Sequence, residues 1–328
     1  MKKVKFLLVL ICLFVCVASS LMFGARYVSP DHVFEILTGA ESSSFEALVV
    51  QERIPRTVFA LLAGSALAVA GILMQSVTRN PIADPSILGI NTGAALAVVM
   101  GIAFLHINTY REYIFLALIG SAVTAVMVYF VSTLGSGGLS PIRLALSGVV
   151  ISALLSSLVN LVMLPRTDVM DEYRFWQIGS VGGAGWNEIY AMLPLLILGF
   201  LLSIFLAPSL NALALGDDVA TGLGVHVGRT RILSAVAAIL LCGTVTALAG
   251  PIGFIGLMAP HMIRMLFGNN IRFLIPASAV LGAGLLTFSD VIGRVISRPG
   301  EVEVGVITAF LGAPIFIIIT MKAKVRSL

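Results

Sequence analysis

Charged side chains are scarce in this sequence: they make up 11% of its 328 residues, against 59% for hydrophobic residues. A soluble domain carries roughly 25% charged residues, and a soluble fold of this length could not hide so much apolar surface. The chain is therefore predicted to be an integral membrane protein. Inside a bilayer every backbone amide must bond within the protein, which leaves helical bundles and closed barrels as the possible folds.

The alternation of a transmembrane barrel is also missing, because no series of segments of about ten residues alternates apolar and polar side chains. Glycine, by contrast, is abundant, with 32 residues, and recurs with alanine and serine in runs such as LLAGSALAVAG (61–71). Small residues let helices approach closely in lipid, where no hydrophobic force draws them together. We therefore predict an all-α membrane protein that forms a single transmembrane domain over residues 1–328.

Residues that usually carry chemistry are few. The three cysteines, Cys12, Cys16 and Cys242, lie in apolar runs, and the four histidines lie in separate segments. Neither HExxH nor the GxxxxGK[ST] phosphate loop occurs, so no catalytic residue, metal site, cofactor or nucleotide site is predicted. Cys12 and Cys16 could face a metal from one side of a helix, but inert buried thiols are the favoured interpretation.

Long apolar runs account for most of the chain. A helix needs about 20 mainly apolar residues to cross a bilayer, and this length gives ten candidate spans. They are residues 5–24, 56–76, 86–105, 113–133, 142–164, 188–207, 231–249, 252–267, 273–290 and 304–321. An even number of spans puts both termini on the same side of the membrane.

The distribution of charge indicates which side that is, because cytoplasmic loops are enriched in lysine and arginine. Twelve of the 20 basic residues, all lysines included, fall on the side of the termini, together with only three acids, Asp84, Asp217 and Asp218. Both termini are therefore expected in the cytoplasm. The spans contain almost no ionisable side chain at mid-depth, whereas an ion-coupled carrier normally needs one.

Two polar segments lie on the predicted cytoplasmic side. RNPIADP (79–85) indicates a tight turn between the second and third spans, because its prolines stop helices and Asn80 and Asp84 suit turns and caps. The loop 208–231 mixes short helical runs with four glycines, which predicts one or two short helices joined by a glycine turn. A surface for a cytoplasmic partner and a plain connector are both compatible with this loop.

The opposite side carries arginines close to the ends of spans. Arg53 and Arg56 precede one span in RIPR, and Arg294 follows another. Such arginines often have no role beyond extending their charged groups to the membrane–water interface. The alternative is a basic docking site for an acidic partner or an anionic ligand. The loop 171–186 contains Trp176 and Trp186, which we expect to anchor at the lipid headgroups.

Several segments together resemble the FecCD-like permeases, which are membrane subunits of ABC importers for iron–siderophores, haem and vitamin B12. The segments are RIPRTVFALLAGSALAVAGILMQSVTRNPIADPSILGINTGA, LGDDVATGLGVHVGRTR, GPIGFIGLMAPHMIRM and EVEVGVITAFLGAPIF. They occur in family order and cover nearly the whole chain. The resemblance implies a BtuC-like type II ABC importer permease with about ten transmembrane helices, located in the bacterial cytoplasmic membrane and without enzymatic activity or a nucleotide site of its own.

The resemblance also implies partners. These are a cytoplasmic ABC ATPase, an extracytoplasmic substrate-binding lipoprotein or periplasmic protein, and a second permease subunit, identical or paralogous, around a central pathway. Membrane lipid surrounds the assembly, and no nucleic acid is implied. The expected cargo is an iron–siderophore complex, with haem or cobalamin as alternatives. Outside the family, the rivals are an ion-coupled secondary transporter and an intramembrane enzyme that uses His261 or the cysteines.

Residue roles follow from the matched motifs. Arg53, Arg56 and Arg294 match the family's positions for docking of the binding protein, whereas Arg298 has no clear counterpart. Ser140, Pro141 and Ile142, before the fifth span, lie where the family has its cytoplasmic gate. The family also suggests that the fifth and tenth spans line the pathway. In the loop 208–231, the family's ATPase-coupling element is matched by Asp218, Ala220, Gly222, Leu223 and Gly224.

Overall fold

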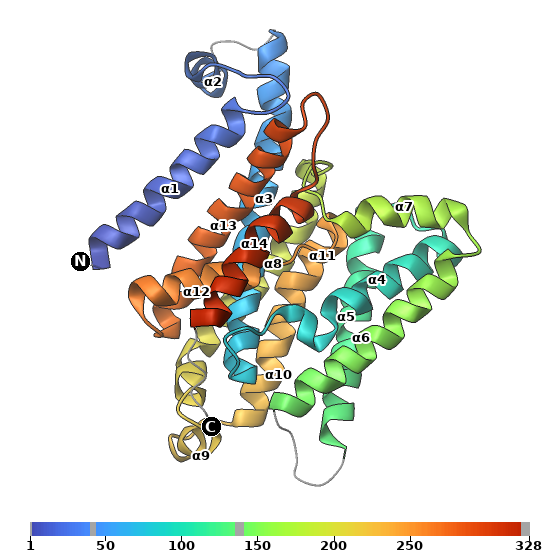
Figure 1. Cartoon of the computed structure of the whole chain (residues 1–328), viewed down its shortest axis with the longest axis vertical. Coiled ribbons are helices and arrows are strands. Elements are labelled where there is room, and N and C mark those ends of the chain that lie inside the picture. The colour runs from blue at the N-terminus through green and yellow to red at the C-terminus, as the bar shows by residue number, and fades with distance from the viewer. Residues whose placement is uncertain (1, 40–43, 135–140, 323–328) are drawn as a thin grey trace.

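The computed structural model describes residues 2–39, 44–134 and 141–322 of the chain. Over these residues the chain forms helices joined by short connections, with no strand (Figure 1). The prediction of an all-α fold is confirmed.

Seven helices of the described ranges are long and apolar enough to cross a membrane. They are α1 (Lys2–Met22), α3 (Phe45–Thr78), α5 (Tyr110–Thr133), α6 (Pro141–Met163), α8 (Trp186–Leu213), α13 (Ile271–Ile296) and the continuous run of α10 (Val227–Ala238), η3 (Ile239–Gly243) and α11 (Thr244–Ala249). Shorter apolar helices complete the set: α4 (Ile90–Met100) with η2 (Gly101–Leu105), α12 (Ile255–Phe267) and α14 (Val304–Lys322). Each of the predicted spans corresponds to one of these helical segments.

Four further helices are short: α2 (Pro30–Leu37), η1 (Pro85–Leu88), α7 (Thr167–Ile178) and α9 (Asp217–Gly222). Of these, α2 and α9 lie at opposite ends of the molecule's long axis (Figure 1), and we call these ends the α2 end and the α9 end. Hydropathy does not reveal α7, where a loop was predicted. Trp176 of α7 donates from its indole nitrogen to Ala247 O at 3.0 Å, so its indole contacts the bundle, and its expected role as a headgroup anchor stays a prediction.

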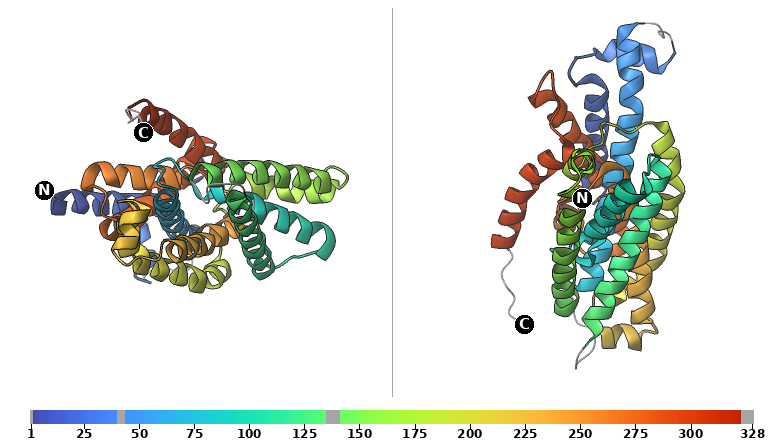
Figure 2. Two further views of the ribbon diagram at one scale, coloured as in Figure 1. Left: turned by 90° about the horizontal axis from the view of Figure 1, so that it is seen from below. Right: turned by 90° about the vertical axis from the view of Figure 1, so that its right-hand side faces the viewer.

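The helix α3 forms the centre of the bundle, where it contacts α13, α12, α10 and α8, while α14 lies at the edge against α12 and α13 (Figure 2). Glycines allow the close contacts of α3. A Cβ atom at Gly64 or at Gly282 of α13 would collide with the backbone carbonyl of the other, and one at Gly71 would collide with Gly256 of α12. The small residues therefore work as predicted, by bringing backbones together.

The polar turn after α3 has the predicted geometry. Arg79 ends α3 in the left-handed conformation with φ 49°, and Asn80 Oδ1 accepts from the Ile82 amide at 3.1 Å. Asp84 caps η1 by accepting from the Ser86 amide at 3.0 Å. Burial raises the pKa of the Asp84 carboxyl, against the opposing effect of this bond. The first half of the turn is exposed, whereas Ala83 is buried, so the second half packs into the bundle.

The cysteines differ from one another. Cys242 is buried in η3, where its thiol donates to Asn91 Oδ1 at 3.4 Å. Cys16 is half-buried, and Cys12 is exposed on α1, so the interpretation of buried thiols is wrong for Cys12.

The glycine contact between α3 and α13 gives a test of the packing. Gly282→Ala places a methyl group against Gly64 O, whereas the nearest atom to a methyl group at Gly284 would be Leu13 Cδ1, at 3.7 Å. Overpacking of this kind costs about 1–3 kcal/mol, so thermal unfolding of the purified protein in detergent should start at a lower temperature in Gly282→Ala. Gly284→Ala, on the same helix, is the matched control, and equal shifts in both variants would contradict this packing.

Candidate functional site

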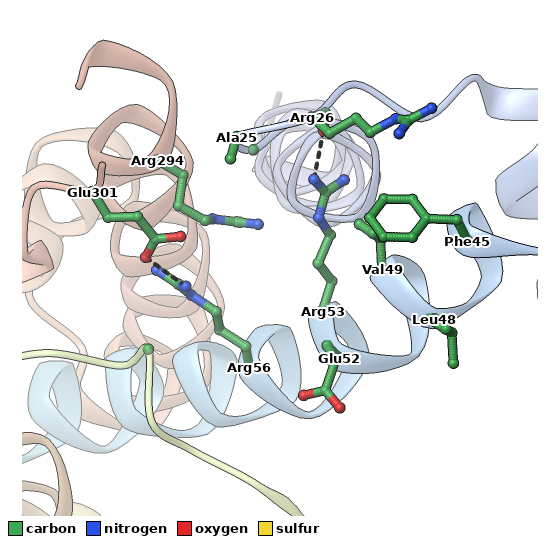
Figure 3. A pocket seen from close by; sticks show the side chains of 12 residues that line it. Ala25, Arg26, Phe45, Leu48, Val49, Glu52, Arg53, Arg56, Arg294 and Glu301 are labelled. Atoms are coloured by element: carbon green, nitrogen blue, oxygen red, sulfur yellow. Dashed lines mark hydrogen bonds and ion pairs between the residues drawn. The ribbon is translucent and has the colours of Figure 1, made fainter. Parts of the chain in front are cut away.

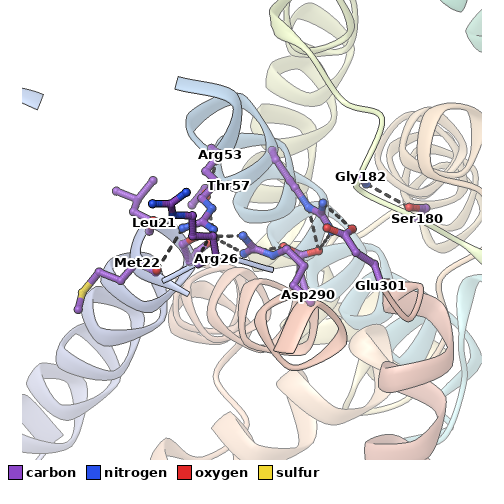
Figure 4. Close-up of polar contacts among 12 residues, drawn as sticks. Leu21, Met22, Arg26, Arg53, Thr57, Ser180, Gly182, Asp290 and Glu301 are labelled. Atoms are coloured by element: carbon purple, nitrogen blue, oxygen red, sulfur yellow. Dashed lines mark hydrogen bonds and ion pairs between the residues drawn. The ribbon is translucent and has the colours of Figure 1, made fainter. Parts of the chain in front are cut away.

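A cluster of charged side chains lies near the α2 end and contains all three predicted docking arginines. Arg53 and Arg56 come from α3, and Asp290 and Arg294 from α13 (Figures 3 and 4). Three of the four residues are almost fully buried, with exposed fractions of 7% for Arg53 and 2% for Asp290 and Arg294. Charges this deep require partners, because an unpaired buried charge is strongly destabilising.

Asp290 lies between two of the arginines. Its Oδ1 accepts from Arg56 Nε at 3.1 Å and from Arg56 Nη2 at 2.7 Å, and its Oδ2 forms an ion pair with Arg294 Nη2 at 2.9 Å. Arg56 also donates from Nη1 to Glu301 Oε2 at 2.8 Å. Glu301 belongs to the connection between α13 and α14, so these contacts join α3, α13 and that connection.

Other donors of the cluster form hydrogen bonds with the last carbonyl groups of α1. Arg294 donates to Ser20 O at 3.1 Å and to Ser20 Oγ at 2.8 Å, and Arg53 donates to the carbonyl oxygens of Leu21 and Met22 at 2.8 and 3.1 Å. The last carbonyls of a helix have no partner inside the helix, and its C-terminal end carries partial negative charge. The two guanidinium groups supply both the donors and the positive charge, and they fix α1 against α3 and α13.

An open cavity of about 580 Å³ lies beside this cluster, lined by side chains of the cluster, the segment after α1 and the first turns of α3 (Figure 3). Arg26, at its rim, is exposed and pairs with Glu46 at 2.8 Å. The structure thus brings Arg53, Arg56 and Arg294 to one cavity, although their guanidinium groups are already bonded within the chain. Arg298 is exposed and lies outside this cavity.

The predicted coupling residues lie together on α9 and the turn after it. Ala220 is fully buried, whereas Leu223 is 63% exposed, so α9 turns one side to the bundle and leaves an apolar side chain accessible. The helix ends with two backbone hydrogen bonds: Val225 N donates to Ala220 O at 3.0 Å, and Gly224 N donates to Thr221 O at 2.9 Å. This Schellman pattern needs a left-handed residue, which glycine supplies, and Gly224 has φ 82°. Asp218 and Gly222 are exposed.

The predicted gate is described only in part. Ser140 lies outside the described residues, Pro141 begins α6, and Ile142 is exposed. The start of α6 lies toward the α9 end (Figure 1).

A second cavity, of about 200 Å³, lies between α4, α6 and α7. Amide and hydroxyl groups make up much of its lining, which includes Asn91, Thr92, Ser156, Asn160, Tyr173 and Gln177. None of these residues was predicted from the sequence, although Ser156 and Asn160 are four positions apart on the predicted fifth span, a spacing that places both on one face of a helix.

The arginine cluster generates a stability prediction. Arg294→Ala removes the bonds to Ser20 and one of the two cations beside Asp290, and breaking a buried pair costs about 3–5 kcal/mol. The unfolding temperature of the variant in detergent should fall clearly below that of the unchanged protein. Arg298→Ala, at an exposed site, should stay within about 0.5 kcal/mol. If both variants unfold at the same temperature, the cluster does not hold the helices together.

Comparison with known proteins gives consistent matches along the chain. The model of the FecCD transport family matches residues 11–322. The ferric enterobactin transport system permease protein FepD of Escherichia coli (strain K12) is 42% identical over 314 residues, which are 95% of this chain and 93% of FepD. The probable siderophore transport system permease protein YfiZ of Bacillus subtilis (strain 168) is 37% identical, over 96% of both chains.

A solved structure is also similar. It is an inward-facing conformation of a metal-chelate type ABC transporter, with 26% identity and a TM-score of 0.85, and the match covers 98% of this chain and 100% of that chain. The fold and the sequence agree over the same length, and the chain is a multi-pass membrane protein that belongs to the FecCD transport family.

Proposed function

We propose that this chain is the permease subunit of an ABC importer that moves an iron–siderophore complex across the cytoplasmic membrane, driven by a separate ATPase. The observation that carries the proposal is the family match over residues 11–322. It is supported by the similarity of the whole fold to a metal-chelate type ABC transporter.

The cargo follows from the relatives. Those compared are named for ferric enterobactin, siderophores, iron citrate and iron hydroxamate, and none of these names refers to haem or cobalamin. The cavity of about 200 Å³ between α4, α6 and α7 could contact only part of such a cargo, through amide and hydroxyl groups that can bond the oxygen atoms on the surface of a ferric chelate. An iron–siderophore complex is therefore favoured over haem and cobalamin.

In this proposal the ATPase and the substrate-binding protein bind at opposite ends of the molecule. The ATPase binds the α9 end, where α9 presents Leu223 and the Gly224 turn, and the excess of basic residues supports a cytoplasmic position for this end. The substrate-binding protein docks at the α2 end. There Arg53, Arg56 and Arg294 act mainly by shaping the cavity and giving it positive potential, because each guanidinium group already donates hydrogen bonds inside the chain.

The mechanism we propose is alternating access without covalent chemistry. ATP binding by the partner moves α9, and two permease subunits rock about a shared pathway that includes α6 and α14. Ser140, Pro141 and Ile142 form the gate at the α9 end. The chain itself supplies no catalytic residue.

Reconstitution tests the function. The chain is placed in liposomes with the ABC ATPase and the binding protein of its own system. Uptake is measured separately for ferric enterobactin, ferric hydroxamates and haem, each labelled with radioactive iron, and for cobalamin labelled with radioactive cobalt. ATP-dependent uptake of a ferric siderophore is expected. Uptake that continues without the ATPase would contradict an ABC importer, and uptake of haem or cobalamin alone would contradict the cargo.

The coupling turn generates a further prediction. Gly224→Glu forces a side chain into the left-handed region, which costs about 1–2 kcal/mol, and deforms the turn that faces the ATPase. ATP-dependent uptake should fall at least about tenfold, the change that 1.4 kcal/mol produces, and less ATPase should co-purify with the permease. Gly228→Glu is the control, since Gly228 has ordinary φ and open space around it. Full uptake by Gly224→Glu would remove the coupling role of this turn.

A further inference from the structure

Asp217, the first residue of α9, is bound by two arginines from distant parts of the chain. Arg79, which is 138 residues earlier, forms an ion pair with Asp217 Oδ1 through Nη2. Arg231, which is 14 residues later on α10, donates from Nη2 to Oδ1 at 3.2 Å and to Oδ2 at 3.1 Å. One carboxylate thus joins the end of α3 and the start of α10 to α9.

Arg79 is itself fixed by its surroundings. It ends α3 with φ 49°, a conformation that costs a residue with a side chain roughly 1–2 kcal/mol, and its Nε donates to the carbonyl oxygen of Leu213 at 3.1 Å. Leu213 is the last residue of α8. The backbone geometry of Arg79 therefore directs its guanidinium group to a point where α3, α8 and α9 meet.

The contacts of Asp217 differ from those of its charged neighbours. The side chain of Arg231 is 11% exposed, against 33% for Arg79 and 42% for Asp217. Asp218 and Arg229 are exposed and have no ion pair with any described residue. An isolated surface pair contributes little, but a carboxylate shared by two arginines, one of them largely buried, forms a network.

The helix α9 depends on such contacts because it has only six residues, far too few for a helix to be stable alone in water. Ala220 is the buried residue of this helix, and the helix also packs beside α8 and α10. The ion pairs of Asp217 add contacts to the end of α3 and to α10, which hold the short helix in one direction. The carboxylate also lies in the first turn of α9, where negative charge is favoured by the helix dipole.

We propose that Asp217, with Arg79 and Arg231, is a positioning latch that makes α3, α8 and α10 move together with α9. This inference rests on the proposed function, in which the ATPase drives α9, and it names the residues that carry that displacement into the membrane helices. The latch predicts a specific defect: without it the ATPase still binds and hydrolyses ATP, but less of that hydrolysis moves cargo.

The experiment measures radioactive iron taken up per ATP hydrolysed, in proteoliposomes that contain the full chain, its ABC ATPase and its binding protein, with ferric enterobactin as cargo. Asp217→Asn, Arg79→Gln and Arg231→Gln should each lower this ratio about fivefold or more, the low end of typical coupling free energies. The amount of co-purified ATPase should not change. Arg229→Gln, a loss of the same charge two positions from Arg231, should leave the ratio unchanged.

Double variants separate a shared latch from independent effects. Asp217→Asn combined with Arg231→Gln, or with Arg79→Gln, should be no worse than the single variants, because residues that act as one unit are not additive. Asp217→Glu keeps the charge and should retain most of the ratio. If Asp217→Asn does not fold, Arg79→Gln, Arg231→Gln and their double variant serve as the test. Additive losses would overturn the latch.

The remaining outcomes are also decisive. An unchanged ratio in Asp217→Asn overturns the latch, and so does a loss of ATPase binding in that variant alone, because Asp217 would then be a direct docking residue. If the unchanged chain neither binds the ATPase nor takes up iron with it, the proposed function fails instead. The two failures are therefore distinguishable.

Discussion

The close approach of α3 to its neighbours is the contact on which the rest of the structure depends. Two glycine pairs, Gly64 with Gly282 and Gly71 with Gly256, let the backbone of α3 touch those of α13 and α12. In lipid, helices gain little from burying apolar surface, so close van der Waals packing supplies the attraction. Because α3 is fixed on two sides, side chains at both of its ends have defined positions.

The length of α3 explains why charges can occupy those ends. Its 34 residues extend about 51 Å at 1.5 Å per residue, whereas the hydrocarbon core of a bilayer is about 30 Å thick. Both ends can therefore reach the polar interfaces, with Arg53 and Arg56 near one end and Arg79 at the other. The low charge of the spans and the charged clusters at the ends follow from the same constraint.

The sequence was sufficient for the parts of the fold that the bilayer dictates. Span length is fixed by membrane thickness, so the apolar runs predicted every long helix, and the glycines predicted close packing. The sequence did not reveal α7 or the packing of Trp176, because a helix outside an apolar run leaves no hydropathy signal.

The partners of the arginines were also missed: Asp290 lies 234 residues from Arg56, and Ser20 lies 274 from Arg294. Such pairs depend on which helices are neighbours, and one sequence does not specify this. The docking, gate and coupling roles came from family resemblance and remain predictions.

The two charged clusters differ in how freely they can rearrange. At the α2 end, Arg294 and Asp290 are almost fully buried, so separating them would leave a bare charge in an apolar site and cost several kcal/mol. At the α9 end, the side chains of Asp217 and Arg79 are partly exposed, whereas that of Arg231 is 11% exposed. Water can solvate the outer part of this network, but a carboxylate shared by two arginines still ties α9 to the end of α3 and to α10. The two ends of α3 therefore differ in kind: a buried cluster fixes it against α1 and α13 at one end, and a partly solvated network joins it to a short helix at the other.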